Sequence, residues 1–216
     1  MPRTLAIFDF DGTLADSFPW FVDVLNQIAS AHGFRAVDAE EIETLRGLRS
    51  REIIRRMGVP MWKLPSIATH MRARMARDID GIALFDGVDR LLRRLSDGGV
   101  PVAILTSNSY ENVRHVLGPA NAALVSHFEC GASIFGKATK IRTVLRKSGT
   151  PPTAAFCIGD ELRDIEAARA AGVRCGAVSW GYATREALAA HGPDAMFDSL
   201  DAIAETLLPN GDARPG

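Results

Sequence analysis

Cysteine is scarce in this chain and gives no support for a disulfide framework. The 216 residues include three cysteines, Cys130, Cys157 and Cys175, which have no close CxxC spacing and leave one unpaired in any disulfide scheme. Cys157 lies inside an apolar, strand-like run, as a buried thiol would. These features argue against a disulfide-stapled secreted scaffold and favour thiols in a reducing compartment.

Net charge and long apolar runs are lacking as well. The 25 lysines and arginines nearly balance the 26 aspartates and glutamates, so the net charge of -1 gives no global reason to expect nucleic-acid binding. No apolar stretch approaches the length needed to span a membrane. A secretion signal is not expected near the N-terminus, because the charged residue Asp9 would fall within its apolar core. We therefore expect a cytoplasmic protein that binds neither nucleic acid nor membrane.

The order of helical and strand-like segments divides the chain into two parts. Helices alone are predicted in the first part, at 19–31, 39–46, 50–57 and 66–79. Strands are predicted at 5–8, 101–105, 127–132, 154–158, 175–180 and 195–197, with helices at 86–97, 110–117, 139–147, 164–171, 184–190 and 200–208. Strands separated by single helices imply a parallel sheet. The predicted fold class is α/β, with a Rossmann-like parallel core of residues 1–16 and 81–216 interrupted by an all-helical domain of residues 17–80.

Two aspartates, Asp9 and Asp11, follow the first predicted strand and precede Gly12-Thr13, which has the composition of a tight turn. Burying a carboxylate is costly unless it is paired or bound to a metal. Residues two apart in a strand face the same side, so both carboxylates are expected to converge beyond the strand's carboxyl end. Open parallel sheets bind ligands at that edge. The alternative is an Asp-rich turn with no further role.

Polar residues also follow two later strands. Thr106-Ser107-Asn108 comes directly after residues 101–105, where a hydroxyl and backbone N–H groups can donate to phosphoryl oxygens. The same run is common in turns and helix caps. Asp160 and Asp164, four apart at a strand–helix junction, suit a hard divalent cation that prefers oxygen ligands. Asp164 is alternatively a helix N-cap.

These motifs resemble those of the haloacid dehalogenase-like (HAD) hydrolase superfamily, whose first signature is similar to Asp9-Phe10-Asp11-Gly12-Thr13. The chain looks most similar to phosphoglycolate phosphatase-like members. In this superfamily a lysine holds the negative charges of the nucleophile and the phosphate together. The resemblance points to Lys137 for this role, and Lys140, three residues on, is the alternative. It spans residues 5–180, and residues 17–80 match only in position and helical character. The resemblance implies that they form a cap, which closes over the active site.

The resemblance implies Mg²⁺-dependent hydrolysis of phosphate esters. Asp9 would attack phosphorus to give an aspartyl-phosphate, and Asp11 would serve as acid and then base. Dehalogenases and phosphonate-cleaving members lack this second aspartate, so Asp11 argues for phosphate esters. The phosphate would be bound by Thr106, Ser107, Asn108 and Lys137. The metal would be held by Asp9, the backbone carbonyl of Asp11, Asp160 and, directly or through water, Asp164.

The predicted cap is locally basic. Residues 46–77 hold one acid, Glu52, and nine basic residues: Arg46, Arg49, Arg51, Arg55, Arg56, Lys63, Arg72, Arg74 and Arg77. A basic lid would attract a doubly anionic substrate such as a phosphorylated carboxylic acid. The hypothesis is that one or two of Arg46, Arg49 and Arg51 reach into the site. The alternative is that most are solvated faces of amphipathic helices.

The leading function is therefore hydrolysis of a small phosphorylated metabolite by a monomer or homodimer. A sugar phosphomutase would use the same core and return the phosphate to a sugar. A non-catalytic protein would retain the fold and bind a partner through the basic cap, because fold alone does not prove activity. Trp180 and Tyr182, after a core strand, are expected to pack rather than to line the site.

Overall fold

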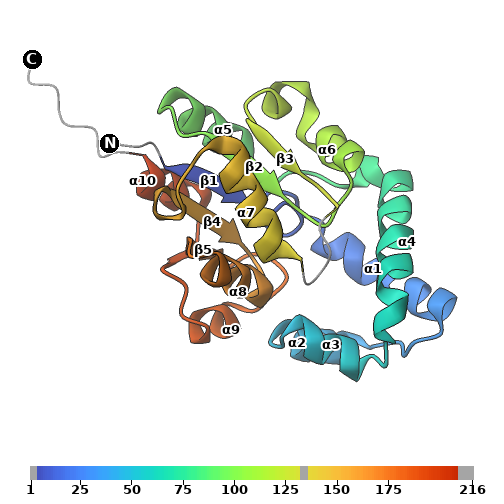
Figure 1. Ribbon diagram of the computed structural model, residues 1–216. Helices are drawn as coiled ribbons and strands as arrows, with labels where there is room; N and C mark the ends of the chain where they lie inside the picture. The colour runs from blue at the N-terminus through green and yellow to red at the C-terminus, as the bar shows by residue number, and fades with distance from the viewer. Residues whose placement is uncertain (1–3, 132–135, 209–216) are drawn as a thin grey trace, which may run out of the picture.

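Six parallel strands form one sheet at the centre of the molecule, in the order β3-β2-β1-β4-β5-β6. The structure is a computed structural model that describes residues 4–131 and 136–208 (Figure 1). The strands are β1 (Leu5–Phe8), β2 (Val102–Leu105), β3 (His127–Glu129), β4 (Ala155–Gly159), β5 (Arg174–Val178) and β6 (Ala195–Phe197). The predicted fold class, α/β with a parallel sheet, is confirmed.

Helices cover both faces of the sheet. One face packs against α5 (Val88–Asp97), α6 (Tyr110–Ala122) and α10 (Leu200–Leu207). The other packs against α7 (Lys137–Ser148), α8 (Leu162–Ala171) and α9 (Arg185–Ala190), and the short turn η3 (Pro152–Ala154) precedes β4. Along β1, Ala6 and Phe8 enter the first hydrophobic layer, whereas Leu5 and Ile7 enter the second. Strands buried on both faces read as continuous apolar runs, which is why the sequence indicated them clearly.

Helices fill the segment between β1 and α5, and none of residues 17–80 is in a strand. They are α1 (Phe18–His32), α2 (Ala39–Arg46), α3 (Ser50–Arg56) and α4 (Leu64–Arg77), with the short turns η1 (Met61–Lys63) and η2 (Ile79–Gly81). Leu25, Val37, Leu45 and Met57 form a small core of their own. This separate core supports our proposal that residues 17–80 form a cap domain. Figure 1 shows these helices beyond the carboxyl ends of the strands.

Several predicted boundaries differ from the structure. The helix predicted from residue 139 begins at Lys137, and the helix predicted from Asp164 begins two residues earlier, at Leu162. The helix predicted to end at Leu117 is followed by a break at Gly118 (φ 69°, ψ 165°), after which one more turn runs to Ala122. The end of the third predicted strand, Ala132, lies outside the described residues, as do residues 1–3 and 209–216 of the predicted core.

The sheet sets the position of the site. β1 lies between β2 and β4, so the residues that follow these three strands meet at one edge, below the cap helices. No helix in the described part of the chain has both the length and the apolar composition that crossing a membrane requires.

Candidate active site

Asp9 ends β1 and carries a buried carboxylate. Its backbone N–H donates to the Ile158 carbonyl oxygen at 2.8 Å, which extends the pairing of β1 with β4. One carboxylate oxygen accepts a hydrogen bond from the Phe10 N–H at 2.7 Å, and the other lies 2.5 Å from Lys137 Nζ. Burial raises the pKa of Asp9, Lys137 opposes the rise and Asp164 adds to it. The carboxylate is therefore fixed at the strand end beside a cation.

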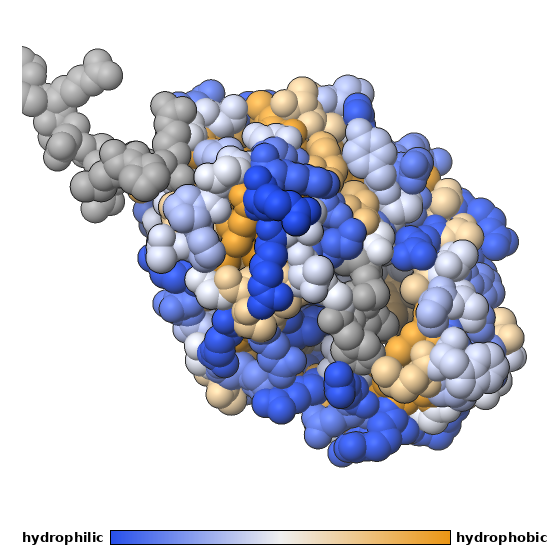
Figure 2. Space-filling view, in the orientation of Figure 1, coloured by the Kyte–Doolittle hydropathy of each residue, from blue (hydrophilic) through white to orange (hydrophobic). Residues whose placement is uncertain are grey.

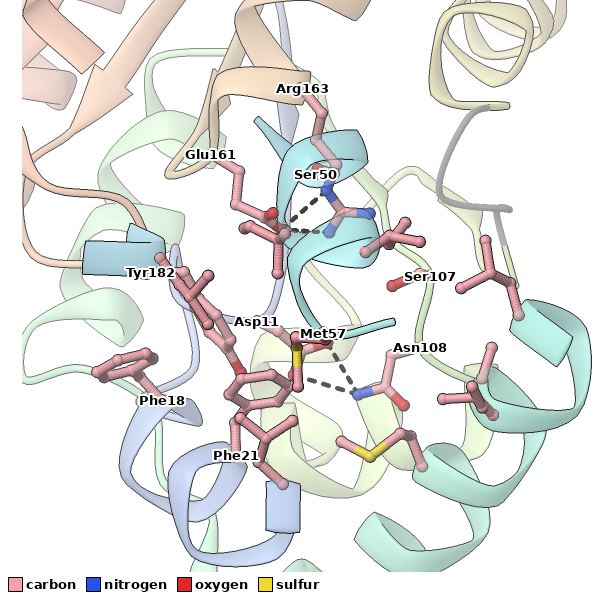
Figure 3. A pocket seen from close by; sticks show the side chains of 18 of the residues that line it. Asp11, Phe18, Phe21, Ser50, Met57, Ser107, Asn108, Glu161, Arg163 and Tyr182 are labelled. Atoms are coloured by element: carbon pink, nitrogen blue, oxygen red, sulfur yellow. Dashed lines mark hydrogen bonds and ion pairs between the residues drawn. The ribbon is translucent and has the colours of Figure 1, made fainter. Parts of the chain in front are cut away.

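Asp11 lies in a different environment from Asp9. Its carboxylate accepts hydrogen bonds from Asn108 Nδ2 at 3.1 and 3.3 Å and lines a cavity below the cap (Figure 3). Burial and then the charge of Asp9 raise the pKa of Asp11 to about 6, although hydrogen bonds from Ser17 and Asn108 lower it. The two carboxylates share the strand end, as expected, but each has its own partners. A carboxyl group with a pKa near neutrality is suited to giving and taking a proton.

Lys137 joins two of the buried carboxylates. Its Nζ lies 2.5 Å from Asp9 Oδ2 and 2.5 Å from Asp164 Oδ1. Burial alone would lower the pKa of Lys137, but Asp164 and Asp9 raise it above its ordinary range, so the ammonium stays charged. Lys140 Nζ lies instead 2.5 Å from Glu129 Oε1, outside this cluster. Of the two candidate lysines, Lys137 is the one beside Asp9.

The loop after β4 supplies Asp160 and Asp164. The Asp160 carboxylate accepts hydrogen bonds from Thr13 Oγ1 at 2.7 Å and from the Tyr182 N–H at 2.8 Å. Asp164 Oδ2 accepts from the N–H groups of Asp160 at 3.1 Å and Glu161 at 3.0 Å. Asp164 is thus the third residue of α8, where it satisfies N–H groups at the helix start and also contacts Lys137.

Three carboxylates form a group that fits a metal ion. Asp9, Asp160 and Asp164 each offer an oxygen, and these atoms all lie within 4.8 Å of one another. Burial and then the charge of Asp9 raise the pKa of Asp160 well above its ordinary value. Within the described part of the chain, Lys137 is the one ammonium group that pairs with members of this trio, and it pairs with Asp9 and Asp164. The three carboxyl groups therefore outnumber their cation. Buried oxygen ligands with excess negative charge suit a hard divalent cation such as Mg²⁺.

The residues after β2 face Asp11 and the cap. Thr106 is buried, and its Oγ1 accepts a hydrogen bond from the Asn108 N–H at 3.0 Å. Besides its bonds to Asp11, Asn108 Nδ2 donates to Met75 Sδ of α4 at 2.9 Å. Asn108 Oδ1 accepts from Asn112 Nδ2 at 3.0 Å. Asn108 therefore connects the end of β2 to Asp11 and to the cap.

A cavity of about 700 Å³ separates the cap from the strand ends. Asp11, Ser107 and Asn108 line it from the core side. Tyr182 lines it as well, and its ring packs edge-on against Phe18 with 5.0 Å between centroids. Figure 3 shows the Tyr182 side chain beside Asp11 in this cavity. Tyr182 therefore both packs, as the sequence suggested, and lines the site.

Arg46 and Arg49 connect the cap to the core. Arg46 Nε donates to the Tyr182 carbonyl oxygen at 2.9 Å, and Arg46 Nη2 donates to the Gly181 carbonyl oxygen at 3.1 Å. Arg49 Nε lies 3.2 Å from Glu166 Oε1, and Arg49 is not among the described residues that line the cavity. That these arginines bind substrate stays a prediction, and their present partners are protein groups.

One pair of charged residues was not anticipated from the sequence. Arg163 Nε donates to Glu161 Oε1 at 2.8 Å, and both residues line the cavity. Burial alone would lower the pKa of Arg163, but the charges of Glu161 and Asp164 raise it. Its place beside Asp164 at the start of α8 was the only sequence signal.

The sequence matches the family model described as haloacid dehalogenase-like hydrolase over residues 6–178. The chain belongs to the haloacid dehalogenase-like hydrolases. The matched stretch includes the three clustered aspartates, Asp9, Asp160 and Asp164. It also includes Thr106 and Lys137.

Relatives agree with this assignment over nearly the whole chain. A phosphoglycolate phosphatase of Synechococcus elongatus is 34% identical over 206 residues, covering 93% of this chain and 97% of the relative. A HAD-like hydrolase of Streptococcus pneumoniae shares the fold, with a TM-score of 0.77 at 22% identity, over 95% of this chain and 98% of that one. CbbY of Rhodobacter sphaeroides, solved in complex with phosphate, has a TM-score of 0.68 at 26% identity and covers 92% and 95%. The resemblance to phosphoglycolate phosphatase-like HAD hydrolases is confirmed.

Proposed function

We propose that this protein hydrolyses small phosphomonoesters with Mg²⁺ as cofactor, through an aspartyl-phosphate formed on Asp9. The observation that carries the proposal is the buried group of Asp9, Asp160 and Asp164, with Lys137 against two of its members and Asp11 beside it. Family membership supports the same reaction class.

In the first step, an Asp9 carboxylate oxygen forms a bond to phosphorus as the bond from phosphorus to the alcohol oxygen breaks. The Lys137 ammonium, 2.5 Å from Asp9, offsets negative charge at this point. The departing alcohol oxygen takes a proton from the Asp11 carboxyl group, whose pKa of about 6 leaves it partly protonated near neutrality. The products of this step are the alcohol and phosphorylated Asp9.

In the second step, water attacks phosphorus and passes a proton to the Asp11 carboxylate, and the bond from phosphorus to Asp9 breaks. Phosphate leaves and both carboxyl groups return to their starting states. The Thr106 hydroxyl and the Ser107 N–H would supply donors for phosphoryl oxygens, whereas the Asn108 N–H already donates to Thr106 Oγ1. Asn108, bonded to Asp11, holds the acid–base carboxylate in place.

Mg²⁺ would be held by Asp9, Asp160, the backbone carbonyl of Asp11 and, directly or through water, Asp164, and would neutralise phosphoryl oxygens as a Lewis acid. The clustered carboxylate oxygens of Asp9, Asp160 and Asp164 support this choice of ion, because Mg²⁺ prefers oxygen ligands. The two hydrogen bonds to Asp160, from Thr13 and Tyr182, fix its carboxylate beforehand.

Phosphoglycolate is the first ester to test, because that substrate appears in the name of the Synechococcus elongatus relative. We also propose a cytoplasmic setting. The free thiols of Cys157 and Cys175, both buried, are consistent with a reducing compartment. Assembly as a monomer or homodimer stays a prediction.

The proposal is tested by phosphate release from a panel of small phosphomonoesters, with Mg²⁺ and then with excess chelator. We expect chelation to lower the rate by at least about 100-fold, because three buried carboxylates would repel an anionic ester. Restoring Mg²⁺ should restore the rate. Full activity in chelator would contradict the metal assignment. Dependence on an added bisphosphate would favour a phosphomutase, and no turnover of any ester would favour a binding protein.

Gly181 should be intolerant of a side chain, because a Cβ there would lie 2.2 Å from Asp160 Cβ. We expect Gly181→Ala to displace Asp160 and raise the Mg²⁺ concentration for half-maximal activity by about tenfold or more. The same variant should show less thermal stabilisation by added Mg²⁺. Gly81→Ala is the control, since a Cβ there meets nothing within 4 Å. Unchanged Mg²⁺ dependence in Gly181→Ala would argue against Asp160 as a ligand.

A further inference from the structure

The cavity above Asp11 has a polar floor and apolar walls. Asp11, Ser107 and Asn108 lie on its core side. The cap side presents half-buried apolar side chains from α1 to α4: Phe21, Ile42, Ile53, Ile67 and Met71. Figure 2 shows apolar surface in the hollow between α4 and the pair α2 and α3, at the lower right of the view. A concave apolar surface continuous with a polar reaction centre is typical of a ligand site.

The arginines of the cavity already donate to protein oxygens. Arg72 Nη1 donates to the Ser107 carbonyl oxygen at 3.1 Å, and Arg163 pairs with Glu161. Arg46 donates to two carbonyl oxygens of the loop after β5. Among the described residues that line the cavity, these three are the cationic ones. A guanidinium has five N–H donors, so a substrate carboxylate on the cap side would share an arginine that is already paired with protein oxygens.

The size of the cavity also exceeds what a two-carbon acid needs. Its volume of about 700 Å³ lies within the range that drug-sized ligands fill. The phosphoryl group would occupy the floor formed by Asp11, Ser107 and Asn108. The rest of the volume, bounded by the cap, is then left for the alcohol part of the ester.

We infer that the cap selects phosphomonoesters whose leaving alcohol carries an uncharged apolar chain, a specificity that rests on the proposed hydrolysis. Transfer of such a chain from water to the cap wall is favourable in proportion to its apolar area. The chemistry is unchanged: the alcohol leaves with the Asp11 proton, and phosphate is released from Asp9. The short anionic glycolyl group gains little from the same wall.

A series of primary alkyl phosphates tests this specificity, because ethyl, butyl and hexyl phosphate have leaving alcohols of nearly equal acidity and differ in apolar area. We expect kcat/KM to rise about threefold per methylene, roughly 80-fold from ethyl to hexyl phosphate. Phosphoglycolate should fall below hexyl phosphate. A flat or falling series, or a higher kcat/KM for phosphoglycolate, would overturn the inference and leave the hydrolysis standing.

A matched pair of variants locates the effect. Ile67→Gln combined with Met71→Gln makes the α4 wall of the cavity polar, and neither residue belongs to a buried core cluster among the described residues. We expect the ratio of kcat/KM for hexyl over ethyl phosphate to fall below about tenfold. Val22→Gln, half-buried on α1 and outside the lining, should keep the full ratio. The ratio is independent of the folded fraction, so an unchanged value in the double variant would count against the inference.

Binding measurements separate this specificity from the hydrolysis on which it rests. Ethylphosphonate and hexylphosphonate have no bond from phosphorus to an ester oxygen that the enzyme could cleave. In calorimetric titrations with Mg²⁺ present, hexylphosphonate should bind about 80-fold more tightly than ethylphosphonate. If no ester turns over but this difference is found, the cap specificity holds and the hydrolysis fails. Equal affinities would overturn the specificity whatever the turnover.

Discussion

Replacing Asp9 by Asn should abolish phosphate release and leave the fold at least as stable as the wild type. The variant loses the oxygen that attacks phosphorus, so kcat should fall by about 10⁴-fold or more. Stability should not fall, because burial raises the pKa of Asp9, which means that the ionised carboxylate is disfavoured in the folded state. Lys137 would keep its contact with Asp164. Phosphate release and thermal unfolding, measured on the same sample, check both expectations.

Asp16→Asn is the matched control, since Asp16 lies in the same loop and is exposed. It should retain wild-type turnover. Asp11→Asn should be intermediate, with a loss of about 10²- to 10⁴-fold, because it removes proton transfer but keeps the nucleophile. Appreciable turnover by Asp9→Asn, or trapping of a phosphorylated protein from that variant, would refute the role of Asp9.

Replacing Lys137 by Met should destabilise the protein by about 3–5 kcal/mol in chelator at neutral pH. The change leaves the carboxylates of Asp9 and Asp164 buried without the ammonium that now lies 2.5 Å from each. Removing one partner of a buried ion pair lowers the free energy of unfolding by much more than the intact pair contributes to it, because an uncompensated charge remains buried. Urea unfolding monitored by fluorescence and circular dichroism gives the free energy of unfolding.

Lys140→Met provides the comparison between the two lysines that the sequence left open. The Lys140 side chain is 37% exposed, and its partner Glu129 keeps Lys147 at 2.9 Å. Its loss should therefore cost no more than about 1 kcal/mol and leave turnover unchanged. Equal destabilisation by the two substitutions would mean that Lys137 does not compensate the buried carboxylates of Asp9 and Asp164.

The cost of Lys137→Met should depend on pH in a defined direction. Burial alone would raise the pKa of Asp164, but Lys137 and Arg163 bring it below its ordinary value of 3.8. A carboxyl group whose pKa is lower in the folded state stabilises the fold above its unfolded pKa, and this contribution is lost as pH falls through the folded pKa. Without Lys137, burial raises the pKa of Asp164, so the variant takes up this proton at a higher pH than the wild type does. The difference in unfolding free energy between wild type and variant should thus be largest near neutrality and shrink as the pH falls. A difference that grows in acid would contradict this linkage.

Motif positions were accessible from the sequence, whereas side-chain partners were not. Asp9, Thr106 and Asp160 could each be placed after a strand because the strands are continuous apolar runs that end abruptly in polar residues. The contact between Asp9 and Lys137 joins residues that are 128 positions apart in the sequence. Lys137 and Lys140 are only three residues apart, so the sequence gave no means of preferring one over the other. The first turn of α7 decides it, because that turn directs Lys137 to the strand ends and Lys140 to Glu129.

The cap shows the same division more strongly. The positions of its helices were predicted from the spacing of apolar residues, and its local excess of basic residues is plain in the sequence. Composition suggested a lid that grips an anion. In the folded protein Arg46 instead bonds to backbone carbonyls of the core, and the apolar faces of the helices line the cavity.

The sequence by itself determined the parallel sheet, the inserted helices and the family, because these follow from local periodicity and from motifs at strand ends. Only the tertiary structure decided which lysine faces Asp9, how the pKa of Asp11 is raised, and which faces of the cap meet the site. Those properties depend on burial and on partners distant in the sequence, and both arise only when the helices and the sheet pack together.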